Sequence, residues 1–163
     1  MIYIGIDPGL NGAIGVLSEI SPYWRSEVHD TPTMVVSGTK DKRVYNVPAM
    51  AALLKPFKGA DALVVLEAVH SMPKQGVSSS FSFGEGFGMW KGIIAAYELP
   101  LELVSPQRWK KAILADQGKG KDASRFKAIA LFPALAEQLA RKKDDGRAEA
   151  ILMTEYGRRL RNK

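Results

Sequence analysis

The sequence contains no cysteine and only two histidines, His29 and His70. Without cysteine, disulfide scaffolds, thiolate zinc sites and cysteine nucleophiles are excluded, so any metal site has to be built mainly from carboxylates. No apolar run approaches the roughly 20 residues that a membrane span needs. The chain opens directly on the strand-like MIYIGID, without the basic segment and cleavage site of a secretion signal. We therefore expect a soluble, cytoplasmic protein with no membrane partner.

The chain has 163 residues and a net charge of +6 that is distributed unevenly. A chain of this length can bury about two-thirds of its unfolded surface, so we expect one domain over residues 1–163. Residues 1–104 carry 8 basic and 10 acidic side chains, whereas residues 105–163 carry 15 basic and 7 acidic ones. A basic region favours a polyanionic partner such as nucleic acid, because binding phosphates releases counterions. The alternative is that these side chains only solvate a helical face.

Alternating and apolar runs predict an α/β domain with a mixed five-stranded sheet flanked by helices. Two strands, at residues 3–7 and 13–17, are expected to form a hairpin around PGLNG, and the run DALVVLE at 61–67 is typical of a central strand buried on both faces. The other expected segments are strands at 23–28 and 101–104, loops at 37–43 and 68–80, and helices at 48–57, 79–98, 122–132 and 145–161. Glycines in the helix at 79–98 are expected to let another segment approach its backbone. This order of elements resembles the ribonuclease H fold.

Four carboxylates stand where elements of this fold end or begin. Asp7 ends the first strand, Glu67 ends the central strand, and Asp145 and Glu149 lie four apart on one face of the last helix. If the strands are neighbours and the helix crosses their ends, the carboxylates converge, and divalent cations relieve their repulsion. Oxygen ligands select hard ions such as Mg²⁺ or Mn²⁺. Two such ions about 4 Å apart can activate water and stabilise the leaving oxygen of a phosphodiester.

Each of these acids also has a purely structural interpretation. Asp7 could start the turn DPG, and Glu149 could be a solvated helix residue. Asp144 and Asp145 could be N-terminal helix acids that favour the macrodipole, and Asp144 is itself an alternative ligand. Glu67 needs a partner in either case, because a carboxylate at the end of a buried strand faces a low dielectric. Their joint placement at the ends of elements favours a metal site.

Three segments, YIGIDPGLNGAIGVL, VVLE and KKDDGRAEAILMTEYG, together resemble the RuvC-type Holliday junction resolvases, particularly the small forms carried by bacteriophages. The block HSMPKQGVSSSFSFGEGFGMWKGIIAAYELPLELVSPQRWKK is similar to the same group, so the resemblance covers nearly the whole chain. It implies a ribonuclease H fold, a homodimer and Mg²⁺-dependent symmetric nicking of four-way DNA junctions. The family's four acids fall on Asp7, Glu67, Asp145 and Glu149.

The chain departs from the bacterial members of that family at three points. The last acid, commonly Asp, is Glu149 here, and the last pair of acids is four residues apart instead of three. An aromatic residue that bacterial members place three positions after the second acid, where it pushes at the crossover, is replaced by His70. That function could have moved to Phe81 or Phe83, or it could be absent.

Residues expected to contact DNA fall into a loop and a basic stripe. The loop after Glu67 must overhang the carboxylates, and it is expected to contact the phosphate backbone, the alternative being a variable surface connection. The basic residues between positions 108 and 127 could form a stripe that follows the phosphates, or they could be a solvated charge run. Trp109, which lies among them, is expected in the core. The residues expected to bind DNA are His70, Lys74, Gln75, Phe81, Arg108, Lys110, Lys111, Lys119, Lys121, Lys142 and Lys143.

The sequence therefore predicts a Mg²⁺-dependent endodeoxyribonuclease that resolves four-way junctions by paired nicks and leaves 5′-phosphate ends. Two ions are expected per site, with Mn²⁺ able to replace Mg²⁺. Asp7 would bridge them, Glu67 would hold one, and Asp145 and Glu149 would complete the other. The alternatives are a less selective branched or flap DNA endonuclease, a non-catalytic junction-binding protein, and a phosphotransferase of the actin and sugar-kinase type. The last needs a second lobe, for which 163 residues are too few.

Overall fold

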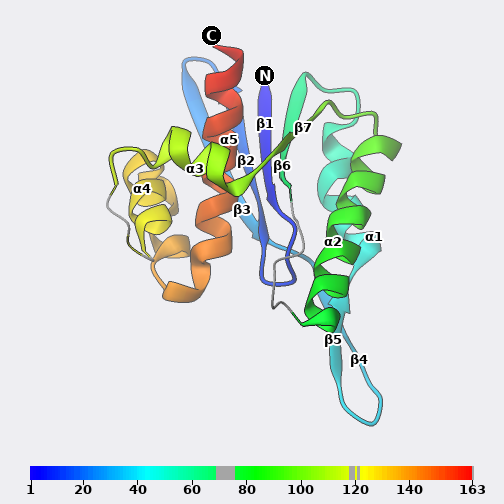
Figure 1. Cartoon of the computed structure of the whole chain (residues 1–163). Helices are drawn as coiled ribbons and strands as arrows, with labels where there is room; N and C mark the ends of the chain where they lie inside the picture. Colours follow the sequence, from blue (N-terminus) through cyan, green and yellow to red (C-terminus); the bar gives the residue numbers. More distant parts are fainter. Residues whose placement is uncertain (69–75, 118–119, 121, 163) are drawn as a thin grey trace.

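A five-stranded sheet in the order β3-β2-β1-β6-β7 forms the centre of the protein (Figure 1). The structure, a computed structural model, describes residues 1–68, 76–117, 120 and 122–162. β2 is antiparallel to β1 and β3, whereas β1, β6 and β7 are parallel, which confirms the predicted mixed sheet. The strands are β1 (Ile2–Asp7), β2 (Ala13–Ile20), β3 (Tyr23–Asp30), β6 (Ala62–Glu67) and β7 (Leu101–Val104).

Asp7 and Glu67 end two neighbouring parallel strands. Ile6 of β1 lies opposite Leu66 of β6, so the residue that follows each of them reaches the same edge of the sheet. β1 and β2 form the predicted hairpin, in which Asp7 pairs with Ala13. β6 is buried almost throughout, as expected for a central strand. The topology therefore brings together the two strand-end carboxylates.

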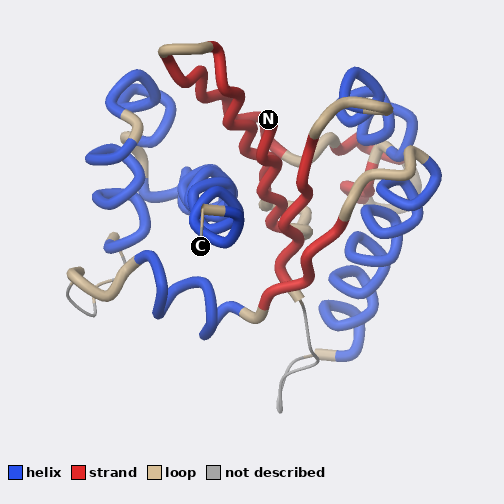
Figure 2. The backbone as a smooth tube through the Cα atoms, turned by 90° about the horizontal axis from the view of Figure 1, so that it is seen from above, coloured by secondary structure: helices blue, strands red, loops and turns tan. Residues whose placement is uncertain are grey.

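Helices cover both faces of the sheet (Figure 2). On one face the last helix lies along β1 and β2, and two further helices pack against it. On the other face α1 and α2 bury their apolar side chains against the sheet. Among the described residues, no helix combines the length and apolar character needed to cross a membrane. The helices are α1 (Val47–Leu54), α2 (Val77–Ala96), α3 (Pro106–Ile113), α4 (Ala123–Leu131) and α5 (Asp145–Arg161), with short 3-10 helices η1 (Lys55–Phe57), η2 (Pro133–Leu139) and η3 (Lys142–Asp144).

A second, two-stranded sheet projects away from the large one between β3 and α1 (Figure 1). Its strands are β4 (Thr33–Val36) and β5 (Lys42–Tyr45). The predicted loop at 37–43 is therefore wrong at its end, because Lys42 and Arg43 pair with Val36 and Val35. The strands of this hairpin are largely exposed, so the sequence lacks the buried, alternating pattern that would have indicated them.

Helix α2 begins earlier than the sequence suggested. Residues 77 and 78, predicted only as loop, belong to the helix, while residues 69–75 of that predicted loop lie outside the described residues. The expected close approach occurs at Gly86, where an added Cβ would overlap the Tyr45 hydroxyl. Around Gly84, Gly88 and Gly92, an added Cβ would meet no described atom within 4 Å. These three glycines therefore leave one face of α2 open.

Candidate active site at the carboxyl ends of β1 and β6

Three of the four predicted carboxylates line one pocket of about 670 Å³. Asp7 comes from the end of β1, Glu67 from the end of β6, and Glu149 from the first turns of α5. The turn after β1, strand β5 and the start of α2 form the rest of the wall. The other lining residues are Gly9, Leu10, Asn11, Gly12, Lys42, Arg43, Tyr45, Ser78, Ser79, Phe81, Ser82, Phe83 and Glu85.

Asp7 is the most strongly perturbed of these acids. Burial and the neighbouring Glu67 and Glu149 raise the pKa of Asp7 from 3.8 to about 7. Two groups oppose this: the backbone N–H of Gly9, which donates to Asp7 Oδ1 at 3.3 Å, and Lys110, whose positive charge lowers the pKa. Asp7 therefore lies in a site whose negative charge is not fully compensated by the protein.

Glu67 is buried and held by an indole. Trp109, which is itself fully buried in α3, donates a hydrogen bond from Nε1 to Glu67 Oε1 at 2.8 Å. Burial raises the pKa of Glu67, the Trp109 hydrogen bond lowers it, and the charge of Glu149 raises it. The bond occupies one carboxylate oxygen and so fixes the orientation of the other.

Glu149 contacts two side chains from the helices that pack beside α5. Lys110 Nζ of α3 lies 2.6 Å from Glu149 Oε1, and Ser124 Oγ of α4 donates to the same oxygen at 3.3 Å. Lys110 also acts on Asp7 and Glu67, since its charge lowers the pKa of both. One lysine thus supplies the positive charge that three carboxylates share.

Gly146 lets the start of α5 approach Asp7 closely. A Cβ at this position would lie 2.6 Å from the carbonyl oxygen of Asn11 and 3.2 Å from Asp7 Oδ2. Any larger residue would push the helix away from the turn after β1. The first turn of α5 therefore lies against the Asp7 carboxylate, where the helix macrodipole favours negative charge.

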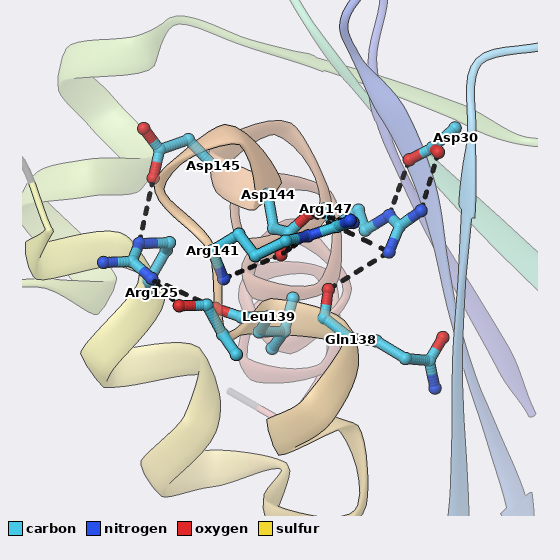
Figure 3. A network of polar contacts seen from close by, with 9 residues as sticks. Asp30, Arg125, Gln138, Leu139, Arg141, Asp144, Asp145 and Arg147 are labelled. Carbon is cyan, nitrogen blue, oxygen red and sulfur yellow. Dashed lines mark hydrogen bonds and ion pairs between the residues drawn. The ribbon is translucent and has the colours of Figure 1, made fainter.

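The fourth predicted carboxylate, Asp145, does not line this pocket. Asp145 Oδ1 lies 3.4 Å from Arg125 Nε, and Figure 3 shows the side chain turned toward α4. The alternative ligand Asp144 is buried and accepts hydrogen bonds from the backbone N–H and the guanidinium of Arg141. The predicted convergence of four carboxylates is thus met by three, and a metal-binding role for Asp145 stays a prediction.

The donor set fits a hard divalent cation. Three carboxylates share one pocket, and the pKa of Asp7 and that of Glu67 are raised partly by repulsion among them. Carboxylate oxygens are the ligands that Mg²⁺ and Mn²⁺ prefer. Within the described parts of the chain, no three acidic or histidine side chains are arranged as an assembled metal site. The fit therefore rests on the chemistry and electrostatics of the donors, and ligation would require their side chains to adjust.

Of the residues expected to bind DNA, Phe81 and Lys110 are the ones that the structure connects with this pocket. Phe81 lines it with 75% of its surface exposed. Lys110 does not line the pocket, but it contacts Glu149, which does. Arg108 is paired with Glu102 at 3.6 Å. Three more are exposed: Lys111, Lys142 and Lys143. The remaining five, His70, Lys74, Gln75, Lys119 and Lys121, lie outside the described residues.

Sequence reasoning missed several residues that build the site. Trp109 was expected only in the core, and its bond to Glu67 joins positions 42 residues apart that no local pattern relates. Ser124 and Gly146 likewise act through contacts made in three dimensions. Arg43 was assigned to a loop, although it lies at the pocket and donates a hydrogen bond to Asn11 Oδ1. Its positive charge was the signal that the sequence offered, since no strand is expected beside it.

No protein-family model matches the chain. The chain is 31% identical over 111 residues to the chloroplastic Holliday junction resolvase MOC1 of Chlamydomonas reinhardtii, a match that covers 66% of the chain but spans only 13% of that relative's length.

Two solved structures match almost the whole chain. Thermus thermophilus RuvC superimposes with a TM-score of 0.61 at 17% identity and covers 98% of this chain and 97% of the other. T. thermophilus RuvC in complex with a Holliday junction substrate gives a TM-score of 0.62 at 14% identity, with 98% and 96% covered. The chain therefore has the ribonuclease H-like fold of RuvC, a mixed five-stranded sheet flanked by helices.

Proposed function

We propose that this protein is a Mg²⁺-dependent endodeoxyribonuclease that resolves four-way DNA junctions by paired nicks, of the small bacteriophage type acting in the cytoplasm. The observation that carries the proposal is the pocket at the carboxyl ends of β1 and β6, where Asp7, Glu67 and Glu149 come together. The RuvC fold supports it, as does the sequence similarity to a relative named as a Holliday junction resolvase.

In this proposal Asp7, Glu67 and Glu149 hold the divalent cation. A bound divalent cation lowers the pKa of a coordinated water and neutralises charge on the phosphodiester, and two such ions would act on both sides of the cleaved bond. Trp109 orients Glu67 through its 2.8 Å hydrogen bond. Lys110 balances the charge of the carboxylates through its 2.6 Å contact with Glu149. Asp145 would have to leave Arg125 to join them.

The surroundings of the pocket suit a polyanionic substrate. Residues 105–163 carry an excess of 8 positive charges over acidic ones, and Lys110, Lys111, Lys142 and Lys143 come from this part of the chain. Such side chains position a nucleic acid by contacting its phosphates, without reading its sequence. Phe81, an exposed aromatic at the pocket, is available to stack against an unpaired base at a junction.

We also propose that the protein acts as a homodimer, because two symmetric nicks require two active sites. The open face of α2 supports this. Gly84, Gly88 and Gly92 recur at intervals of four residues, and an added Cβ at each would meet no described atom within 4 Å. Glycines in this arrangement allow a second helix to approach closely. Sedimentation equilibrium of the native protein and of Gly88→Leu tests the assignment, with a dimer expected for the first and a monomer for the second.

The function is tested by incubating the purified protein with a four-way junction, a flap and a linear duplex in Mg²⁺. The proposal expects paired nicks in the junction only, and no nicks after Asp7→Asn, which removes the central carboxylate. Equal cutting of flap and junction would identify a less selective branched-DNA endonuclease. Junction binding without cleavage in Mg²⁺ or Mn²⁺ would identify a non-catalytic binding protein.

A further inference from the structure

A second pocket, of about 430 Å³, lies on the other side of the turn that follows β1. It shares the turn residues Leu10, Asn11 and Gly12, as well as Arg43 of β5, with the carboxylate pocket. Its walls come from the end of β3, the β4–β5 hairpin, η3 and the start of α5. Its further lining residues are Asp30, Thr31, Thr33, Arg141, Lys143, Asp144 and Arg147.

Two ion pairs organise one side of this pocket (Figure 3). Arg147 donates from Nε and Nη2 to the two carboxylate oxygens of Asp30, both at 2.6 Å, and from Nη1 to the carbonyl of Gln138 at 3.2 Å. Arg141 donates from Nη2 to Asp144 Oδ1 at 2.9 Å. Planar, paired guanidinium contacts of this kind fix both partners in place. The two carboxylates of the pocket are therefore committed to two of its four cations.

Arg43 and Lys143 are the two cations that remain. Among the described residues neither has a carboxylate within ion-pair distance, and both side chains are exposed. Arg43 donates to the side-chain oxygen of Asn11, which places its guanidinium between the two pockets. The pocket thus carries an uncompensated charge of about two next to the first turn of α5, whose macrodipole also attracts anions.

We propose that this pocket binds a phosphate of the DNA backbone, on the same strand as the phosphodiester held at the carboxylates. The inference rests on the proposed nuclease function and adds to it a binding site formed by the projecting hairpin. A DNA strand is a continuous series of phosphates, so a strand held at Asp7 continues past Asn11 into reach of Arg43. Arginine presents donors in a fork that matches phosphate oxygens, and lysine adds a point charge. The site would fix the register of the strand before cleavage.

The test compares native protein with Arg43→Ala/Lys143→Ala by measuring affinity for a four-way junction and for a linear duplex at several salt concentrations. Ca²⁺ replaces Mg²⁺ to prevent cleavage. We expect about a tenfold loss of affinity for each charged contact removed. The slope of log affinity against log salt should fall by about two. Arg43→Lys/Lys143→Arg keeps both charges and should bind within a few-fold of native.

A matched control removes the same charge elsewhere. Lys55 and Lys58 are exposed on and next to η1, before β6 begins, and thus at the opposite end of β1 and β6 from the pocket. Lys55→Ala/Lys58→Ala should leave both affinity and salt slope unchanged. Equal losses in the two double variants, or an unchanged slope in Arg43→Ala/Lys143→Ala, would overturn the proposal. Arg43 and Lys143 form no ion pair in the described structure, and the Arg43–Asn11 hydrogen bond is exposed, so Arg43→Ala/Lys143→Ala should keep a melting temperature close to that of the native protein.

Calorimetry with inorganic phosphate separates DNA from a free anion as the source of the phosphate. Tight binding of inorganic phosphate, together with DNA affinity that is unchanged by Arg43→Ala/Lys143→Ala, would assign the pocket to a free anion and overturn the inference. The nuclease proposal fails separately, if native protein does not nick the junction in Mg²⁺. In that case a weaker, less salt-dependent association of the double variant with duplex DNA would still support the pocket. Native protein that binds no DNA would overturn both.

Discussion

Trp109 Nε1 donates a 2.8 Å hydrogen bond to Glu67 Oε1, joining the first turns of α3 to the end of β6 inside the sheet–helix core. Both residues are buried, and Trp109 completely so, which leaves the indole N–H without exposure to solvent. Burial raises the pKa of Glu67 and the bond lowers it, so the bond favours the ionised form of the carboxylate and orients it. A core tryptophan thus acts as a positioning residue for the candidate active site.

Trp109→Phe should weaken metal binding, because Glu67 loses the donor that favours its ionised form. The lost charged hydrogen bond should also cost about 2 kcal/mol of stability. Trp90→Phe is the matched control, since Trp90 is equally buried and its Nε1 has no hydrogen-bond partner among the described residues. Titration of Mn²⁺ by calorimetry should show weaker binding only for Trp109→Phe. Equal affinities of the two variants would exclude the positioning role.

Asp7→Asn should stabilise the metal-free protein at high pH. The pKa of Asp7 in the folded protein is about 7, above its ordinary value of 3.8, so the folded state binds this proton more tightly than the unfolded state does. The resulting stability is complete below pH 3.8 and is lost as the pH rises through 7. The loss is up to about 4 kcal/mol. In EDTA, Asn should raise the melting temperature by several degrees at pH 8 and hardly at pH 4; the same gain at both pH values would contradict the shifted pKa.

Lys110→Met should move the pH dependence of Mg²⁺-dependent nicking upward. Lys110 lowers the pKa of Asp7 and of Glu67, so its removal leaves both carboxylates protonated to a higher pH. Lys111→Met is the control, because Lys111 is exposed next to it in the same helix. The rate of nicking measured between pH 6 and 9 should shift for the first variant alone. A parallel shift in both would mean that general surface charge is responsible.

Gly146→Ala should disrupt the site even though alanine is the better helix former. The new Cβ would lie 2.6 Å from the Asn11 carbonyl oxygen and 3.2 Å from Asp7 Oδ2. We expect a loss of about 1–3 kcal/mol from this overpacking and a strong loss of nicking. Gly76→Ala, where an added Cβ would meet no described atom within 4 Å, should change neither. Urea denaturation measures the stability of each variant, and the nicking assay measures its activity. Native stability and activity of Gly146→Ala would show that α5 does not need to approach Asp7.

The sequence was sufficient to predict the sheet and three of the acids because their signals are local. Asp7 and Glu67 follow apolar strands, and parallel neighbours end at the same edge, so their meeting follows from topology. Asp145 and Glu149 share a helix face, and helical spacing alone does not separate their roles. The two acids differ because Asp145 contacts Arg125 of α4, whereas Glu149 contacts Lys110 of α3. Such contacts between distant segments leave no periodic pattern.

The β4–β5 hairpin shows the same limit at the level of secondary structure. Its strands are exposed, so hydrophobic alternation is weak and the segment at 37–43 was predicted as a loop. This matters for the site, because Arg43 of β5 lines both the carboxylate pocket and the second pocket. Without β5, the sequence gives no reason to place Arg43 there. Tyr45, at the end of β5, anchors the hairpin by donating a hydrogen bond to the carbonyl of Pro8 at 3.2 Å.

The central claim is that the carboxylates at the ends of β1 and β6 hold the divalent cation of a DNA-cutting site. Anomalous diffraction from crystals soaked in Mn²⁺ tests this claim most directly. The account predicts anomalous density bounded by Asp7, Glu67 and Glu149. The same map would show whether Asp145 leaves Arg125 to join them. The same soak of Asp7→Asn should show no density there. Strong density elsewhere, with none between Asp7 and Glu67 in the native protein, would contradict the account.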